Sequence, residues 1–237
     1  GYGSDIQQNL AELIQAILDE THVPRLRLGS LEPWDLPENF FDLFSNPRLM
    51  PHLHLPLQSG SDSVLKRMAR RCKTEEFTQI VAEARAKVPN INITTDIIVG
   101  FPGETEQEWQ DSFNYIKSIM FGHIHIFTYS LRTGTKAASL PDHVTNAVKK
   151  QRSQQLHKLA ETMKNDFFQQ NKQQRFSVLW EGQKEEISET QHKIFGYTPN
   201  YLRVAAVVNK SQNYENQLST VQIESLETDH LLAHIIE

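Results

Sequence analysis

The sequence predicts an α/β protein that ends in a small all-β module. Strand-like segments alternate with helical segments through residue 171, and this alternation is typical of βα units that form a parallel sheet. From about residue 176 the chain changes to short β-like runs separated by turn residues, which is typical of a small β-barrel. The 237 residues are 38% hydrophobic and 22% charged, so the chain can bury a core of ordinary composition.

The expected elements follow from the hydrophobic spacing along the chain. Residues 5–20 place leucine and isoleucine at helical spacing behind Ser4, a candidate N-cap. We expect strands at 24–30, 51–57, 91–99 and 123–129, and helices at 36–45, 61–87, 105–120 and 142–171. The β-like runs of the C-terminal module are RFSVLW, NYLRVAAVV, QLSTVQIESL and LLAHII.

The predicted strands carry a second pattern, because successive side chains of a strand point to opposite faces. One face carries leucine and isoleucine and should pack on helices. The other face carries Arg25, Arg27, His52, His54, Gln58, Asn92, Thr94, Asp96, His123, His125 and Tyr129. A closed eight-stranded barrel has an apolar centre and a doubly wound sheet is apolar on both faces, so neither fits. We therefore expect an open or incomplete barrel whose polar concave face surrounds a binding site.

Composition excludes several classes of protein. No apolar run approaches the roughly 20 residues that cross a bilayer, so we expect a cytoplasmic protein without a membrane partner. The single cysteine, Cys72, excludes a disulfide framework, a zinc knuckle and an iron–sulfur cluster held by this chain alone. The net charge of −5 argues against a globally basic nucleic-acid binder.

Two local basic segments remain as candidates for phosphate contact. Residues 143–174 hold 6 Lys and Arg against 2 Asp and Glu. The second cluster consists of Lys66, Arg67, Arg70, Arg71 and Lys73. For each segment taken alone, a solvated helix face is the more common explanation.

Four loops follow the carboxyl ends of the predicted strands, where ligands bind in parallel α/β proteins. The loops are Ser30–Pro33, Gln58–Asp62, Gly100–Thr105 and Tyr129–Thr135. The loop GFPGET lacks the dinucleotide spacing Gly-x-Gly-x-x-Gly, and it sets Thr105 to cap the next helix with Glu108. Four such loops, each rich in small and polar residues, favour a binding site over ordinary βα turns.

Two other functions stay open on these residues. The pairs His52/His54 and His123/His125 have the i, i+2 spacing that can chelate a metal on one strand face, as in an amidohydrolase-like, metal-dependent barrel. The same histidines can line the lumen without a metal. A non-enzymatic RNA-binding protein is the other alternative, because aromatic and basic residues at 195–204 can stack on bases and contact phosphate.

Several motifs, taken in order, resemble one family. SLEP, HLHLPLQSGSDSVLKRMARR, TTDIIVGFPGET and YSLRTGT resemble the methylthiotransferases of the radical S-adenosylmethionine (SAM) superfamily. The tail with GYTPNYLRV resembles their TRAM module, a small RNA-binding β-barrel. LRLGSLEP, QSGSDSVLKRMARR and GYTPNYLRV are most similar to the branch that modifies threonylcarbamoyladenosine beside the tRNA anticodon. Sister branches act on isopentenyladenosine or on an aspartate of a ribosomal protein.

This resemblance implies a partial parallel barrel of the radical SAM type at 1–141, a basic linking helix at 142–174 and a TRAM-like barrel at 175–237. It implies a methylthio group placed on C2 of the adenosine, with SAM as radical source and sulfur donated through a second 4Fe-4S cluster. The implied SAM contacts are Glu32, Gln58, Ser59, Ser61, Asp96, Val99, Gly100, Phe101, Tyr129, Ser130 and Arg132. The implied contacts to the anticodon stem-loop of tRNA are Lys149, Lys150, Arg152, Tyr197, Asn200, Tyr201 and Arg203. No catalytic residue and no metal ligand of this chain is implied.

The departures from the family concern the clusters. Such enzymes hold one 4Fe-4S cluster through Cys-x-x-x-Cys-x-x-Cys and a second through three cysteines of an N-terminal domain, whereas this sequence has one cysteine. The first residues, Gly1 to Asp5, resemble the family's loop after the second strand, and Gly29 stands where relatives usually have serine. We therefore expect a C-terminal portion of the enzyme, truncated at its N-terminus, without the N-terminal half of the polypeptide and inactive by itself.

Overall fold

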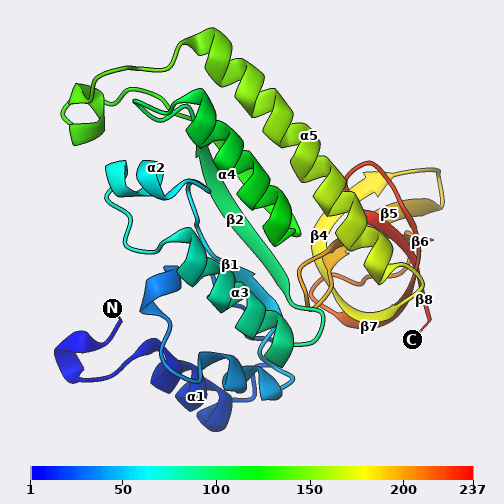
Figure 1. Cartoon of the computed structure of the whole chain (residues 1–237). Coiled ribbons are helices and arrows are strands. Elements are labelled where there is room, and N and C mark those ends of the chain that lie inside the picture. Colours follow the sequence, from blue (N-terminus) through cyan, green and yellow to red (C-terminus); the bar gives the residue numbers. More distant parts are fainter. Residues whose placement is uncertain (1, 237) are drawn as a thin grey trace. The chain divides into compact units, whose positions relative to one another are not determined.

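The structure is a computed structural model that describes residues 2–236 (Figure 1). The chain divides into two compact units, of which the first ends at Met163 and the second begins at Lys164. The long helix α5 (Asn146–Asn171) begins in the first unit and ends in the second. Within the described residues, no helix combines the length and the apolar character that a membrane crossing requires.

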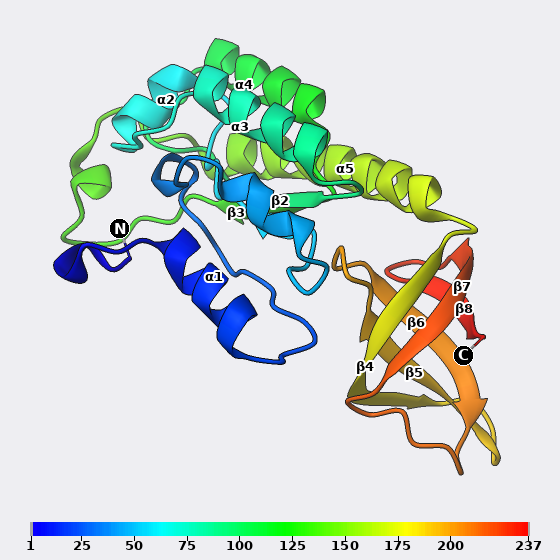
Figure 2. The same cartoon turned by 90° about the horizontal axis from the view of Figure 1, so that it is seen from below.

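The first unit is built on a parallel sheet with the strand order β1-β2-β3. These strands are β1 (His52–His54), β2 (Asn92–Val99) and β3 (His123–Thr128). Helices α2 (Asp62–Arg67), α3 (Thr74–Lys87) and α4 (Glu106–Ile119) lie on one side of the sheet (Figure 2). The predicted α/β class with a parallel sheet is therefore confirmed.

The apolar face of the sheet is buried, as the alternation predicts. Leu53, Ile93 and Ile97 are at most 1% exposed. Phe77 of α3 and Trp109 of α4 belong to the same hydrophobic core. Burial of a large apolar side chain contributes roughly 1.5–3 kcal/mol, so this packing decides which face of the sheet points to the helices. The opposite face of the sheet carries the polar side chains, including His54, Asp96 and His125.

The strand predicted at 24–30 does not form. Leu26 and Ser30 each make only an isolated bridge to a neighbouring segment. The next strand, β1, is also shorter than predicted. It is bounded by Pro51 and Pro56, which have no N–H group to donate to a strand ladder.

The N-terminal helix α1 (Leu10–Glu20) begins later than predicted. Its N-cap is Asn9, whose side chain accepts hydrogen bonds from the backbone N–H groups of Ala11 and Glu12. The Glu12 side chain accepts the Asn9 N–H in return, which completes a capping box. Ser4 lies instead in a short 3-10 helix that precedes α1.

The long helix predicted at 61–87 is interrupted, and the structure has α2 and α3 in its place. Ala69 has a φ of +57°, a left-handed conformation that no α-helix continues through. Helix α3 then begins at Thr74, whose N–H donates to Oδ1 of Asp62 at 2.9 Å. The segment predicted as a helix at 36–45 forms only a 3-10 helix, Phe40–Ser45.

The second unit contains a closed barrel with the strand order β4-β5-β6-β8-β7. Its strands are β4 (Arg175–Glu186), β5 (Gln191–Tyr197), β6 (Arg203–Asn209), β7 (Leu218–Leu226) and β8 (Leu231–Ile235). Val178, Trp180 and Val204 are at most 1% exposed in its core. The barrel confirms the predicted all-β module. Strand β5 was not predicted, because its apolar run consists of Ile194 and Phe195 alone.

Close packing of two barrel strands generates a test of this fold. Gly196 on β5 lies so near β4 that an added Cβ would stand 2.4 Å from the carbonyl oxygen of Leu179. We predict that Gly196→Ala lowers the free energy of unfolding by roughly 1–3 kcal/mol, the usual cost of overpacking. Urea denaturation followed by circular dichroism measures the change.

The control is Val207→Thr on the neighbouring strand β6. Val207 is 43% exposed, and threonine keeps the β-branched shape, so this change should stay within about 0.5 kcal/mol. Equal effects of the two substitutions would contradict the close approach of β4 and β5.

Candidate functional site

Three loops that follow the strands meet at one edge of the sheet. Gln58, after β1, donates its N–H to the carbonyl of Asp96 at 2.8 Å and accepts the N–H of Ile98 at 2.9 Å. Tyr129, after β3, donates its N–H to the carbonyl of Val99 at 2.9 Å. Backbone hydrogen bonds thus continue from the strands into the loops. Four of the predicted SAM contacts consequently lie side by side.

The loop after β2 folds back on itself around Glu104. Gly100 has a φ of +75°, in the left-handed region that glycine tolerates, and donates its N–H to Oε2 of Glu104 at 2.9 Å. Arg152 of α5 donates to the same Oε2 at 2.9 Å and to the Glu104 carbonyl at 3.1 Å. Burial raises the pKa of Glu104 above its usual value, while the Gly100 amide and Arg152 act in the opposite direction.

A second set of contacts joins the same loop to α2. Thr105 caps α4 and Glu108 completes the capping box, as predicted. Arg67 of α2 donates to both carboxylate oxygens of Glu108, at 2.8 and 2.7 Å, and to the carbonyl of Gly103 at 3.2 Å. The hydrogen bonds from Arg67 are the main reason that the pKa of Glu108 falls to about 2. The loop is therefore held from two helices.

Tyr129 has the feature that points most directly to a ligand. Its hydroxyl is buried and has no hydrogen-bond partner among the described residues. Its ring lies edge-on to Phe101, with centroids 5.4 Å apart, and Lys149 donates from Nζ to the Tyr129 carbonyl at 3.0 Å. A buried hydroxyl without a partner costs free energy, so a polar ligand atom at this position would stabilise the site.

The serines of the predicted cofactor loops differ in burial. Ser59 and Ser61 are buried after β1, where Oγ of Ser59 accepts the N–H of Ser61 at 3.2 Å. Ser130 and Arg132 are exposed in the loop after β3. Packing therefore fixes the positions of Ser59 and Ser61, whereas the side chains of Ser130 and Arg132 are not held in this way.

Arg70 holds Glu32 near the site. The sequence placed Arg70 in a basic cluster but did not predict this ion pair. Arg70 pairs with Oε2 of Glu32 at 2.7 Å and donates to the carbonyl of Pro56 at 2.9 Å. The guanidinium also lies over the ring of Trp34, 4.5 Å from its centroid. Glu32 therefore lies beside the loop that follows β1.

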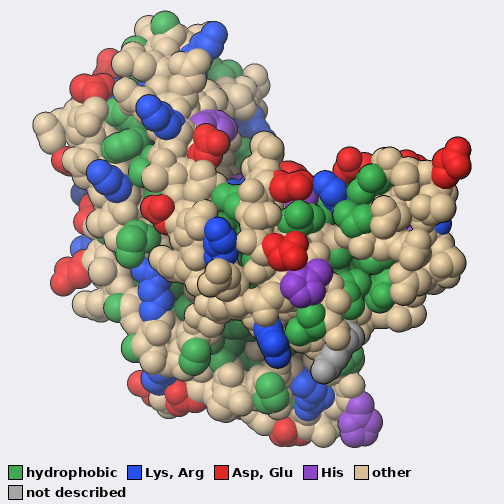
Figure 3. Space-filling model, turned by 90° about the vertical axis from the view of Figure 1, so that its right-hand side faces the viewer, with side chains coloured by type: hydrophobic (Ala, Val, Ile, Leu, Met, Phe, Trp, Pro, Cys, Tyr) green, Lys and Arg blue, Asp and Glu red, His purple; other side chains and the backbone are tan. Residues whose placement is uncertain are grey.

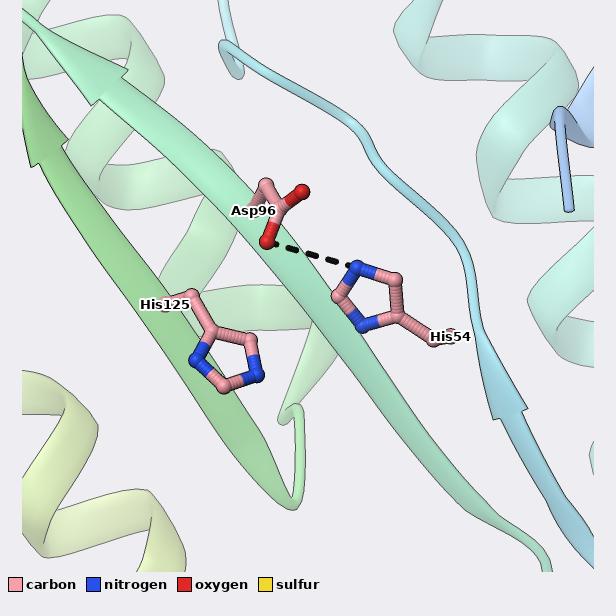
Figure 4. A group of neighbouring side chains, drawn as sticks. All are labelled: His54, Asp96 and His125. Atoms are coloured by element: carbon pink, nitrogen blue, oxygen red, sulfur yellow. Dashed lines mark ion pairs between the residues drawn. The ribbon is translucent and has the colours of Figure 1, made fainter. Parts of the chain in front are cut away.

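The polar face of the sheet brings together His54, Asp96 and His125 (Figure 4). Nε2 of His54 lies 3.3 Å from Oδ1 of Asp96. One donor atom from each residue lies within 4.8 Å of the other two. Sequence alternation placed all three on one face, but it gave no indication that this particular trio would meet.

The four histidines do not form one ligand set. His52 is 2% exposed, its Nε2 lies 3.2 Å from Oγ1 of Thr94, and burial is the main reason that its pKa falls to about 3. His123 is exposed. Within residues 2–236, the His54, Asp96 and His125 cluster is the one group of three such side chains with metal-ligand proximity. The hydrolase alternative, which requires all four histidines, therefore loses its structural basis.

Cys72 does not fit the role of a cluster ligand. Its side chain is buried, and its Sγ donates to the carbonyl of Lys73 at 3.4 Å. Burial raises the pKa of the Cys72 thiol to about 11. Cluster ligation requires the thiolate, which this environment disfavours.

The barrel presents a stacked pair of tyrosines. The rings of Tyr197 and Tyr201 are nearly parallel, 13° apart in plane and 4.5 Å between centroids, and Tyr201 is 37% exposed. The guanidinium of Arg203 lies 4.6 Å from the ring centroid of Phe195 and pairs with Asp229 at 2.6 Å. These aromatic and basic groups lie on β5, on β6 and in the turn between them, and they can stack on bases and contact phosphate.

Two of the predicted RNA contacts are buried. Arg152 is 5% exposed and Asn200 is 1% exposed, and Asn200 donates to Oδ1 of Asn171 at 3.3 Å. Both side chains bind within the protein, so their placement gives no support to direct RNA contact. Lys150 is exposed and Lys149 is half-buried on α5. Basic and acidic side chains are interspersed on the face shown in Figure 3.

Comparison with known proteins identifies sequences to which this chain is similar. Residues 3–116 match the radical SAM superfamily. The chain is 35% identical over 207 residues to the threonylcarbamoyladenosine tRNA methylthiotransferase MtaB of Bacillus subtilis, a match that covers 86% of this chain and 46% of the relative. It is 35% identical over 201 residues to the tRNA-2-methylthio-N(6)-dimethylallyladenosine synthase of Staphylococcus aureus, covering 83% and 38%. The chain spans less than half the length of these curated relatives.

A solved structure supports the fold. Coproporphyrinogen III oxidase (HemN) of Escherichia coli, a radical SAM enzyme, matches with a TM-score of 0.53 and 14% identity over 65% of this chain and 36% of that chain. Together with the match at 3–116, this likeness confirms a partial barrel of the radical SAM type. The closed barrel of the second unit is consistent with a TRAM module.

The buried ion pair leads to a prediction about stability. Arg152→Met leaves the Glu104 carboxylate buried without its counter-ion, and breaking such a pair costs roughly 3–5 kcal/mol. We predict a loss of this size in the free energy of unfolding of the first unit at pH 7, measured by urea denaturation. Glu106→Gln removes only the exposed partner of Arg152 and should cost less than about 1 kcal/mol.

The double variant Arg152→Met/Glu104→Gln separates lost charge pairing from lost packing. It removes the uncompensated carboxylate, so it should be more stable than Arg152→Met alone. A double variant no more stable than the single variant would show that the unpaired charge is not the source of the cost.

The raised pKa of Cys72 predicts low reactivity. At pH 8 a thiol of pKa about 11 is roughly 0.1% thiolate, whereas an unperturbed thiol near 8.5 is roughly one-quarter thiolate. We predict that iodoacetamide alkylates Cys72 at least about 100-fold more slowly in the native protein than in urea. Mass spectrometry follows the reaction, with glutathione as a control for the effect of urea. A native rate within tenfold of the unfolded rate would contradict the burial of this thiol.

Proposed function

This chain belongs to the radical SAM methylthiotransferase family, and on that premise we propose that it is part of a tRNA-modifying enzyme of the cytoplasm. The proposed reaction adds a methylthio group to C2 of N6-threonylcarbamoyladenosine, next to the anticodon. The name of the Bacillus subtilis relative supports this branch. The Staphylococcus aureus relative is as similar, at 35% identity, so the choice between adenosine derivatives depends on the motifs LRLGSLEP and GYTPNYLRV.

The observation that carries the proposal is the buried, unpartnered hydroxyl of Tyr129 where the three loops meet. We propose that SAM binds there and that, when bound, it supplies the radical for the reaction. Gln58, Ser59 and Ser61 would line its methionine and ribose side, and Asp96, Val99, Gly100 and Phe101 would border its ribose and adenine. Tyr129, Ser130 and Arg132 would close the adenine side, with Glu32 facing the site from its strand end.

The chemistry of these side chains suits a nucleoside. Asp96 is partly exposed on the polar face, where its carboxylate can accept hydrogen bonds from ribose hydroxyls. Phe101 and Tyr129 form an aromatic corner that can pack against adenine. The ion pair of Glu104 and Arg152 holds the loop that carries Phe101, so these two residues position the site without contacting the ligand.

We propose that cysteines from another part of the same polypeptide hold the 4Fe-4S clusters. This chain has one cysteine, and its buried thiol has a pKa of about 11, so its residues do not fit a cluster. The residues of this chain would then bind and orient SAM and tRNA but would not complete the reaction alone.

Each unit supplies some of the proposed tRNA contacts, because Lys149 and Lys150 of α5 belong to the first unit and the barrel residues belong to the second. We divide the chain into a partial barrel at 1–141, a linking helix at 142–174 and a TRAM barrel at 175–237 that binds the anticodon stem-loop. Tyr197, Tyr201 and Arg203 offer a stacking surface with a positive charge, and Lys149 and Lys150 offer charges on α5. We leave Arg152 and Asn200 out of this surface because both are buried.

Deletion of the coding sequence for this chain in its source organism tests the function. We predict that 2-methylthio-N6-threonylcarbamoyladenosine disappears from tRNA and that the unmodified N6-threonylcarbamoyladenosine accumulates. The 2-methylthio derivative of dimethylallyladenosine should not change. Liquid chromatography with mass spectrometry of digested tRNA measures all three nucleosides.

A plasmid copy of the intact gene should restore the modification. A copy with Tyr129→Phe should restore it less well than a copy with Tyr214→Phe, because the Tyr214 hydroxyl accepts a hydrogen bond from Gln212 in the second unit and belongs to none of the three loops. Loss of the dimethylallyl derivative instead would assign the other branch, and no change in either derivative would exclude methylthiolation of these adenosines.

A further inference from the structure

The three polar residues of the sheet come from three neighbouring strands. His54 is the last residue of β1 and pairs in register with Thr94 of β2. Asp96, two residues further along β2, pairs in register with His125 of β3. Because residues two apart on a strand share a face, all three side chains project from the same side of the sheet (Figure 4). The arrangement is therefore a property of the strand register and not of one flexible loop.

The orientation of the His54 ring is defined by Thr94. Nδ1 of His54 lies 2.9 Å from Oγ1 of Thr94, and its Nε2 lies 3.3 Å from Oδ1 of Asp96. In the tautomer that donates from Nδ1 to the threonine oxygen, the lone pair of Nε2 faces Asp96 and is available to a metal ion, whereas in the other tautomer the Thr94 hydroxyl donates to Nδ1 and Nε2–H donates to the carboxylate. A bound cation selects the first tautomer, because it takes the place of the Nε2 proton between the ring and the carboxylate. A hydrogen bond from the remote ring nitrogen is also the usual way in which proteins orient a metal-binding histidine.

We propose that His54, Asp96 and His125 bind a divalent transition-metal ion of the zinc or ferrous type. Two imidazole nitrogens and one carboxylate oxygen are a donor set that suits both ions and leaves coordination positions open. The donor atoms lie within 4.8 Å of one another, and the ligands of a tetrahedral zinc ion lie roughly 3.4 Å apart. His125 is exposed, so its ring can turn to close this difference.

The site differs from a chelate within one strand. His123 and His125 are two residues apart on β3 and their ring centroids are 4.6 Å apart, yet His123 is outside the cluster of donors. The carboxylate of Asp96 supplies the negative charge that a divalent ion needs, and a second histidine on β3 would not. The matched pair His125→Ala and His123→Ala therefore distinguishes the cross-strand site from the His-x-His chelate.

Titration of the chain without an affinity tag with Co²⁺ and Zn²⁺ tests the proposal. Calorimetry should give one ion per chain, and bound Co²⁺ should produce visible absorption bands of a site with fewer than six ligands. His54→Ala, Asp96→Asn and His125→Ala should each weaken Zn²⁺ binding by at least about 30-fold, since each removes a direct ligand. His123→Ala should change binding by less than about threefold. Thr94→Val, which removes the contacts of Oγ1 with His54 and with the buried His52 but no direct ligand, should weaken binding by roughly 10–100-fold.

Circular dichroism and the melting temperature of each variant show whether it is folded before its titration is interpreted. Asp96→Asn keeps the shape of the side chain, so its Zn²⁺ titration tests the proposal even where an alanine variant does not fold. Wild-type binding no tighter than that of Asp96→Asn would overturn the proposal, and so would a loss in His123→Ala as large as in His125→Ala. The titration contains neither SAM nor RNA, so its result is independent of the proposed methylthiotransferase function.

Discussion

The buried ion pair between Glu104 and Arg152 is the contact on which the arrangement of the site depends. A carboxylate that is 1% exposed is stable only when it is paired and hydrogen-bonded, and Glu104 meets this condition through Arg152 of α5 and the N–H of Gly100. These bonds fold the loop after β2 back on itself. The reversal lets α4 begin at Glu106 and leaves Phe101 beside Tyr129. The position of the aromatic corner thus follows from one internal charge pair.

The hydrogen bonds from Arg67 to Glu108 and Gly103 also explain how the short helix α2 is stabilised. Helix α2 is only Asp62–Arg67, too short to be stable by itself. Its last residue, Arg67, binds both oxygens of Glu108 and the carbonyl of Gly103, so tertiary contacts hold the helix in place. The loops after β1 and β2 are thereby joined to each other. A ligand bound between these loops would contact residues whose positions are already fixed, which lowers the entropic cost of binding.

Local patterns in the sequence predicted those elements whose causes are local. The apolar alternation predicted the buried face of the sheet, and Thr105 with Glu108 predicted the start of α4. The errors arose where distant residues decide the outcome. A strand requires a partner ladder, and the segment 24–30 finds only isolated bridges. The helix over 61–87 breaks at Ala69, which adopts a left-handed conformation that alanine does not signal in a sequence.

The same distinction explains why the sequence did not single out the group His54, Asp96 and His125. Spacing along one strand predicts neighbours at i and i+2, and it therefore pointed to His52 with His54 and to His123 with His125. Proximity across strands depends on register, which no single strand encodes. Register places His125 beside Asp96 and brings His54 to the other side of that carboxylate. His52, two residues earlier on β1, lies on the same face but is buried against Thr94, so one strand supplies both a buried histidine and a partly exposed one on the polar side of the sheet.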